Sequence, residues 1–103
     1  MLVTKENIKR GMILVDMYGY SMTLYDFYQV VKIKGASVEL IPLKTRTGNM
    51  HGFMQWQVIP IKACGYMQKD VIKKRFNKYN NISFNSSLSI YDDNHEYIED
   101  HED

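Results

Sequence analysis

The chain has 103 residues, of which 45% are hydrophobic and 13% aromatic, and its formal net charge is +1. This length predicts one domain with a single modest core, and the apolar content excludes a disordered chain. One cysteine, Cys64, excludes an internal disulfide and a cysteine-cluster metal site. No apolar run approaches the roughly 20 residues of a membrane span, and the first residues lack the order of a signal peptide. We therefore expect a soluble cytoplasmic protein with no membrane partner.

The small net charge hides an asymmetry along the chain. Residues 92–103 hold seven of the 12 acidic residues and no Lys or Arg. The remaining residues hold all 13 Lys and Arg with only five acids, which gives them a net charge of +8. A basic body followed by an acidic segment is the pattern of a folded domain with an interaction or solubilising tail.

The first half of the chain predicts a helical turn and then three strands. Thr4 can cap a short helical turn over residues 5–10 that stops at Gly11. Residues 12–17 form an apolar strand, and residues 18–22 form a loop. Residues 24–34 are a strand, and the turn at 35–36 leads to a returning strand over 37–43.

Alternation along residues 24–34 predicts which side chains share a face. Tyr25, Phe27, Gln29, Val31 and Ile33 are expected on one face, and Asp26, Tyr28, Val30, Lys32 and Lys34 on the other. The β-branched and aromatic residues favour a strand over a helix. Phe27 and Val31 are expected to point inward.

The second half predicts three more strands. Residues 44–52 are a polar loop, residues 53–61 a strand ending near Pro60, and residues 70–78 a basic strand. Residues 82–90 alternate as a half-buried strand with a wet serine face. From Asp92 onward we expect a solvated tail.

Six short strands with hairpin spacing predict a small all-β domain. At this size a partly open barrel limits exposed edges, with an SH3-like barrel as the first choice and an OB-like barrel as the second. The predicted organisation is a barrel domain over residues 1–91 and an acidic, flexible tail over residues 92–103.

The sequence offers little that is typical of an enzyme. No phosphate loop, dinucleotide fingerprint or hydrolase motif is present. His51 lies in the polar loop without a recognisable nucleophile or paired carboxylate, while His95 and His101 lie in the acidic tail, which lacks a framework for a metal. We therefore predict no catalytic residues, no metal and no cofactor.

The segment 73–79, with sequence KKRFNKY, places Lys73 and Arg75 among further basic and aromatic residues. Cations that meet phosphates and rings that stack on bases suit nucleic acid. The alternative is an edge strand that lysines keep from aggregating.

Tyrosines around Gly19 form a second candidate surface. Tyr18 and Tyr20 flank this glycine in the predicted loop, and Tyr28 lies on the strand face opposite the core. Such rings can form a stacking wall. Trp56 reads as a core or rim residue, with a ligand contact as the alternative. The predicted ligand-binding residues are Tyr18, Tyr20, Tyr28, Trp56, Lys73 and Arg75.

The stretch GYSMTLYDFYQVVK resembles a family of small proteins carried by bacteriophages and other mobile elements. The match is carried by Gly19, Tyr20, Thr23, Asp26, Phe27, Tyr28, Gln29, Val30 and Val31, and the resemblance covers about residues 8–91. Tyr18 stands where the family often has Trp, and the acidic tail lies outside the family pattern.

The resemblance implies a non-enzymatic accessory protein that counteracts a host defence in the host cytoplasm. Such a protein would sequester a nucleotide-like ligand or block a host macromolecule, and exposed barrel edges would allow a homo-oligomer. The alternatives are a nucleic-acid-binding regulatory protein that uses segment 73–79, and an inhibitor whose acidic tail mimics the charges of DNA.

Overall fold

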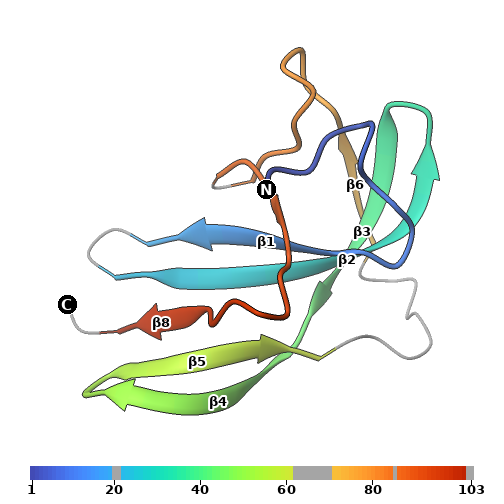
Figure 1. Ribbon diagram of the computed structural model, residues 1–103. Helices are drawn as coiled ribbons and strands as arrows, with labels where there is room; N and C mark the ends of the chain where they lie inside the picture. Colours follow the sequence, from blue (N-terminus) through green and yellow to red (C-terminus); the bar gives the residue numbers. More distant parts are fainter. Residues whose placement is uncertain (20–21, 62–70, 85, 102–103) are drawn as a thin grey trace.

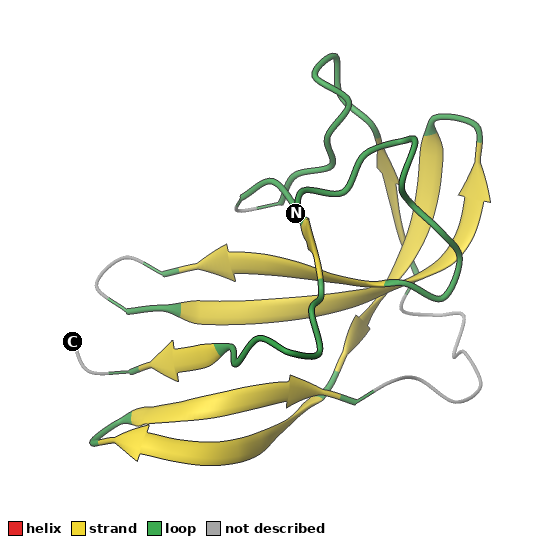
Figure 2. Ribbon diagram, in the orientation of Figure 1, coloured by secondary structure: helices red, strands yellow, loops and turns green. Residues whose placement is uncertain are grey.

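The computed structural model describes residues 1–19, 22–61, 71–84 and 86–101, and this part of the chain is all-β (Figures 1 and 2). The strands are β1 (Ile13–Tyr18), β2 (Leu24–Lys34), β3 (Ser37–Leu43), β4 (Thr45–Gly52), β5 (Gln55–Pro60), β6 (Ile72–Arg75), β7 (Ser89–Ile90) and β8 (Ile98–Asp100). They form two antiparallel sheets, with orders β6-β3-β2-β1-β7 and β4-β5-β8. The all-β prediction is confirmed.

The two sheets meet at two points. The chain passes from β3 to β4 through Lys44, so one continuous stretch belongs to both sheets (Figure 1). On the other side, β8 lies beside the start of β2, where Thr23 and Asp100 exchange backbone hydrogen bonds of 3.1 and 2.9 Å. Among the described residues the strand pairings do not close into a complete barrel.

The β2–β3 hairpin has the bounds that the sequence predicts. Gly35 has a φ of 59°, a left-handed conformation that glycine adopts without a steric penalty, and it begins the two-residue turn. Lys34 and Ser37 pair directly across that turn. Local turn chemistry and alternation therefore suffice to define this hairpin.

A β-bulge interrupts the hairpin at Val31. Val30 pairs with Leu40 and Lys32 pairs with Glu39, so Val31 is an extra residue on β2. Paired residues of antiparallel strands share a face, so the bulge shifts the alternation of β2 by one position.

This shift corrects the predicted faces of β2. Ile33 pairs with Val38 and so lies on the face of Tyr28 and Val30, whereas the sequence pattern placed it with Phe27. Lys32 and Lys34 lie on the face of Phe27 instead. A strictly alternating pattern gives the wrong faces here, because the sequence does not show that Val31 lacks a partner on β3.

The five-stranded sheet has an apolar cluster on each face, which corrects the expectation of a single core. The first cluster packs under the N-terminal segment and consists of Val3, Ile8, Leu14, Tyr28, Val30, Val38, Leu40, Ile82 and Leu88. The second packs toward the three-stranded sheet, with Val15, Phe27 and Val58 buried among Ile13, Tyr25, Leu43, Trp56, Tyr91 and Tyr97. The central strands are covered on both faces, so two small clusters share one sheet.

The N-terminal segment makes one hydrogen-bonded turn rather than the predicted helical turn over residues 5–10. The Ile8 amide donates to the Thr4 carbonyl at 3.0 Å, and the Asn7 amide donates to Thr4 Oγ1 at 3.3 Å. The chain then leaves this pattern, because the Gly11 amide donates to the Val30 carbonyl of β2 at 2.7 Å. A single turn forms too few hydrogen bonds to offset the conformational entropy that is lost when a helix is nucleated.

Three other segments differ from the sequence prediction. Residues 45–52, predicted as a polar loop, form β4, whose side chains are mostly exposed. Only the end of the predicted strand 82–90 is a strand, β7, because the chain folds back and the Leu88 amide donates to the Ile82 carbonyl at 2.8 Å. Residues 98–100 lie in the segment predicted as a solvated tail and form β8 beside β5.

The largest fully buried ring of the second cluster leads to a stability prediction. Phe27 is 1% exposed, and its ring meets those of Tyr91 and Tyr97 edge to face at 5.8 and 5.7 Å between centroids. We expect Phe27→Ala to lower the free energy of unfolding by about 3–5 kcal/mol in urea denaturation. Phe53→Ala is the control, since Phe53 is 80% exposed, and its effect should stay within about 0.5 kcal/mol. Equal midpoints for the two variants would contradict the packing described.

Candidate functional site

A basic groove lies across β2, β3 and β6, near the hairpin turn. It has a volume of about 330 Å³. It is lined by Lys32, Lys34, Ser37, Val38, Glu39, Lys73, Lys74 and Arg75. Five of these eight residues are cationic and one is acidic, so the groove is suited to an anion.

The strand register orders the groove into two rows that cross the sheet. In one row Glu39 lies between Lys32 and Lys73, and in the other Ser37 lies between Lys34 and Arg75. Neighbouring strands are about 4.8 Å apart, so the two cations of a row are anchored roughly 10 Å from each other. Along a strand the rows are roughly 7 Å apart. We call Lys32, Lys34, Lys73 and Arg75 the cation rows.

The bulge at Val31 is what brings these rows together. Without the extra residue, Lys32 and Lys34 would lie on the opposite face from Lys73 and Arg75. All four side chains are exposed, which leaves their charges available to a ligand. The sequence prediction included Lys73 and Arg75 but missed Lys32 and Lys34, because a bulge leaves no signal in an alternating pattern.

Three groove residues, Lys74, Glu39 and Lys32, have partners within the protein. Lys74 lies on the other face of β6, where its Nζ is 4.4 Å from the centroid of the Phe84 ring. Glu39 Oε2 lies 3.8 Å from Lys32 Nζ, an exposed ion pair whose contribution to stability is small. Glu39 therefore lowers the positive charge of the groove without holding its strands together.

Tyr28 is a buried residue, in contrast to its predicted role on a ligand-binding surface. Its ring stacks on Phe84 at 4.6 Å with an interplanar angle of 8°, inside the first apolar cluster. Burial, and then the nearby charge of Asp26, raise the pKa of Tyr28 to about 12. Tyr28 is held by packing and contributes to the core.

Tyr18 lies at the end of β1 rather than in a loop. Its hydroxyl donates to Asp26 Oδ1 at 3.4 Å, and burial followed by the charge of Asp26 raises its pKa. Asp26 pairs with Asp16 across the β1–β2 ladder, and its own pKa is raised by burial and then by Asp16. Tyr20 lies outside the described residues.

Trp56 lies on β5 and is half-buried against the second cluster. Its indole stacks on the His101 ring at 4.4 Å with an interplanar angle of 12°, and His101 Nε2 is 3.0 Å from Glu99 Oε1. Neither Trp56 nor the tyrosines Tyr18 and Tyr28 line the basic groove. Of the five predicted ligand-binding residues that the structure describes, only Lys73 and Arg75 come together in it.

A second, larger hollow of about 610 Å³ lies between β1 and the segment 86–97. Its lining combines Met1, Leu2, Val15, Met17, Tyr25, Ser86, Ser87, Ser89, Ile90, Asp92, His95 and Tyr97. Tyr25 and Tyr97 contact edge to face at 5.3 Å and contribute to the second cluster. Among the described residues no Lys or Arg lines this hollow, so its described lining is not suited to an anion.

His51 pairs with one carboxylate instead of joining a larger cluster of titratable side chains. His51 Nε2 lies 2.6 Å from Glu96 Oε2, which joins β4 to the segment before β8. In the described ranges no three His, Cys, Asp or Glu side chains gather in a way that could hold a metal ion. Within these same ranges, no helix is long and apolar enough to span a bilayer. Cys64 lies outside them.

The raised pKa of Tyr28 predicts a loss of stability in alkali. An unfolded tyrosine ionises near pH 10, whereas Tyr28 in the folded protein stays protonated to about pH 12. The unfolded state therefore binds fewer protons between these values, and the stabilisation present below pH 10 falls as the pH rises toward 12. Tyr28→Phe should reduce this fall, measured as the difference between urea midpoints at pH 8 and pH 11. Tyr79→Phe, at an exposed tyrosine, should leave it unchanged, and an equal fall in wild type and Tyr28→Phe would contradict the prediction.

Comparison with known proteins gives no independent assignment: no protein-family model, no curated protein and no solved structure matches this chain.

Proposed function

We propose that this protein is a non-enzymatic binding protein whose basic groove contacts the phosphate backbone of nucleic acid. The observation that carries the proposal is the pair of cation rows on one exposed face of β2, β3 and β6. Lys and Arg that neutralise phosphates release condensed counterions, which provides affinity without reading the sequence. The proposal develops the alternative function expected for segment 73–79 and adds β2 to the surface.

The groove favours a polymer backbone over a captured nucleotide. In the described part of the chain no aromatic side chain lines the groove, so a single base would find no ring among these residues to stack on. Cations spaced across three strands suit charges that recur along a chain. A nucleotide-like small ligand is therefore the less favoured occupant of this groove.

A small partly open barrel, SH3-like or OB-like, is the fold description that we propose for the two sheets together. The continuous passage from β3 to β4 and the Thr23–Asp100 pairing support it, because they make strands surround the second cluster on several sides. OB-like barrels bind oligonucleotides on a strand face. This likeness is one of architecture and adds only modest support.

A role against a host defence remains a prediction that rests on the resemblance to phage proteins. Binding of nucleic acid in the host cytoplasm would be compatible with such a role. A homo-oligomer also remains a prediction. The alternative of an inhibitor that mimics DNA assumes a free acidic tail. This alternative is less favoured, because Ile98–Asp100 within the acidic segment pair with β5.

Removal of two cations tests the proposal. The double variant Lys73→Gln/Arg75→Gln should bind random-sequence DNA several-fold more weakly at low salt. The slope of log affinity against log salt should fall in magnitude by about 2, because about two phosphate contacts are lost. Fluorescence anisotropy over a salt series measures both quantities.

The matched control is Lys44→Gln/Arg46→Gln, which removes the same charge from exposed positions at the start of β4. It should retain the wild-type slope to within about 0.5. Equal losses in both double variants would indicate a general charge effect and contradict the groove, and absence of wild-type binding at low salt would contradict the function.

The acidic residue of the groove provides a test in the opposite direction. Glu39→Gln should strengthen DNA binding, because it removes a negative charge from between Lys32 and Lys73. Glu96→Gln is the control, since it removes a carboxylate that pairs with His51 elsewhere, and it should leave DNA affinity unchanged. Weaker binding by Glu39→Gln in the same anisotropy assay would argue against this groove as the anion site.

A further inference from the structure

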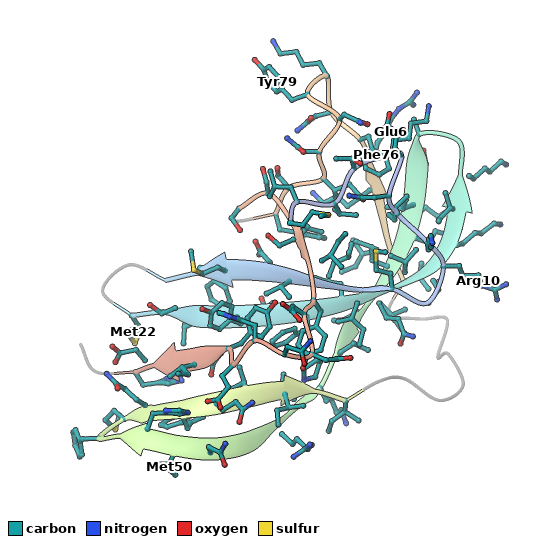
Figure 3. The ribbon with its side chains drawn as sticks, viewed as in Figure 1. Glu6, Arg10, Met22, Met50, Phe76 and Tyr79 are labelled. Carbon is teal, nitrogen blue, oxygen red and sulfur yellow. The ribbon has the colours of Figure 1, made fainter. Side chains whose placement is uncertain are left out.

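One exposed aromatic ring lies in the loop that follows β6, the strand that carries Lys73 and Arg75. Tyr79 is 71% exposed, and its loop projects beyond β6 (Figure 3). In the described part of the chain only Phe53, at the tip of the β4–β5 hairpin, is a more exposed aromatic residue. The other rings near the groove are occupied, since Phe76 packs against the first cluster and Phe84 stacks on Tyr28.

The loop that carries Tyr79 begins where the groove ends. The Phe76 amide donates to the Ala36 carbonyl at 2.9 Å, so β6 follows β3 as far as the hairpin turn before the chain departs. Tyr79 follows Arg75 by four positions, which limits the distance between their Cα atoms to about 14 Å. A short strand of nucleic acid is long enough to span this distance.

Hydrogen bonds hold this loop in one conformation. Asn77 Oδ1 accepts from the Tyr79 amide at 2.9 Å and from the Asn81 amide at 3.1 Å. The Asn77 amide in turn donates to the Asn81 carbonyl at 2.9 Å, and Asn80 adopts a left-handed φ of 64°. An ordered loop loses little conformational entropy when a ligand binds to it.

The N-terminal segment braces the same loop. The Lys5 amide donates to Asn80 Oδ1 at 3.3 Å, and the Asn80 side-chain amide donates to Glu6 Oε2. This bond engages the Glu6 carboxylate beside the loop. The cation beside the ring is Lys78, whose Nζ lies 5.1 Å from the Tyr79 centroid. A ring with an adjacent cation is suited to a base and its phosphate.

We propose that Tyr79 is a base-stacking residue and that the protein prefers single-stranded to double-stranded nucleic acid. This inference rests on the proposed function, because the cation rows supply the backbone contacts. A single strand exposes the faces of its bases to Tyr79, whereas a duplex keeps them stacked inside. Aromatic stacking on successive bases is the common means of binding single strands without sequence preference.

The test compares a labelled single-stranded oligothymidylate of about 12 nucleotides with a mixed-sequence duplex of the same length in fluorescence anisotropy. Tyr79→Ala should weaken single-strand binding about tenfold and duplex binding by less than about twofold. Tyr79→Trp should retain the wild-type single-strand affinity. Phe53→Ala, which removes a ring that is 80% exposed at the tip of the β4–β5 hairpin, should change neither affinity.

A second variant distinguishes the effect of the Tyr79 ring on binding from the effect of the loop conformation that positions it. Asn77→Ala keeps Tyr79 but removes the acceptor for two loop amides, and it should weaken single-strand binding by a smaller factor than Tyr79→Ala. If Tyr79→Ala binds single strands as wild type does while Lys73→Gln/Arg75→Gln fails, the stacking proposal is overturned and the basic groove stands. If wild-type protein binds neither oligonucleotide at low salt, both proposals are overturned.

Discussion

The structure depends on β2, a single strand whose side chains contribute to two apolar clusters and to a charged surface. Along β2, Phe27 packs toward the three-stranded sheet while Tyr28 and Val30 pack toward the N-terminal segment. Beyond these residues the same strand carries lysines that would be unfavourable in either cluster. The bulge at Val31 resolves this conflict, because it ends one alternation and begins another. On the hairpin side of the bulge, the face that carries Lys32 and Lys34 is thereby exposed to solvent and available to a ligand, while Val38 stays buried on the other face.

Local signals were sufficient for the parts of the fold that are built from neighbouring residues. The hairpin of β2 and β3 follows from Gly35 and from alternation on both sides of it. Strand β4 could not be predicted from such local signals. Its polar residues reflect exposure at the edge of a sheet, and polarity alone does not separate an exposed strand from a loop. Strand β8 was hidden by acidic neighbours, although Tyr97 beside it packs in the second cluster.

Part of the candidate site could also be predicted from local sequence. Lys73 and Arg75 are two positions apart on one strand, so period-two spacing places them on one face. Lys32 and Lys34 lie on the same face only because Val31 is unpaired. A single sequence also does not show which strands that are distant in the chain pair with each other. The tyrosines were misjudged in the opposite way. Tyr28 shares its predicted face with Asp26 and Lys32, yet its ring lies in the first apolar cluster and Phe84 stacks on it.

The position of β8 has a consequence for the order of folding. The second cluster contains Tyr91 and Tyr97, and the sheet beside it is completed by Ile98–Asp100, which pair with β5 and meet Thr23. The Thr23–Asp100 contact joins residues separated by 77 positions, so its loop-closure entropy is paid late. On a ribosome, the β2–β3 hairpin is complete more than fifty residues before β8 is synthesised. Until then the edge of β5 that pairs with β8 has unpaired backbone groups, and such an edge is prone to aggregation.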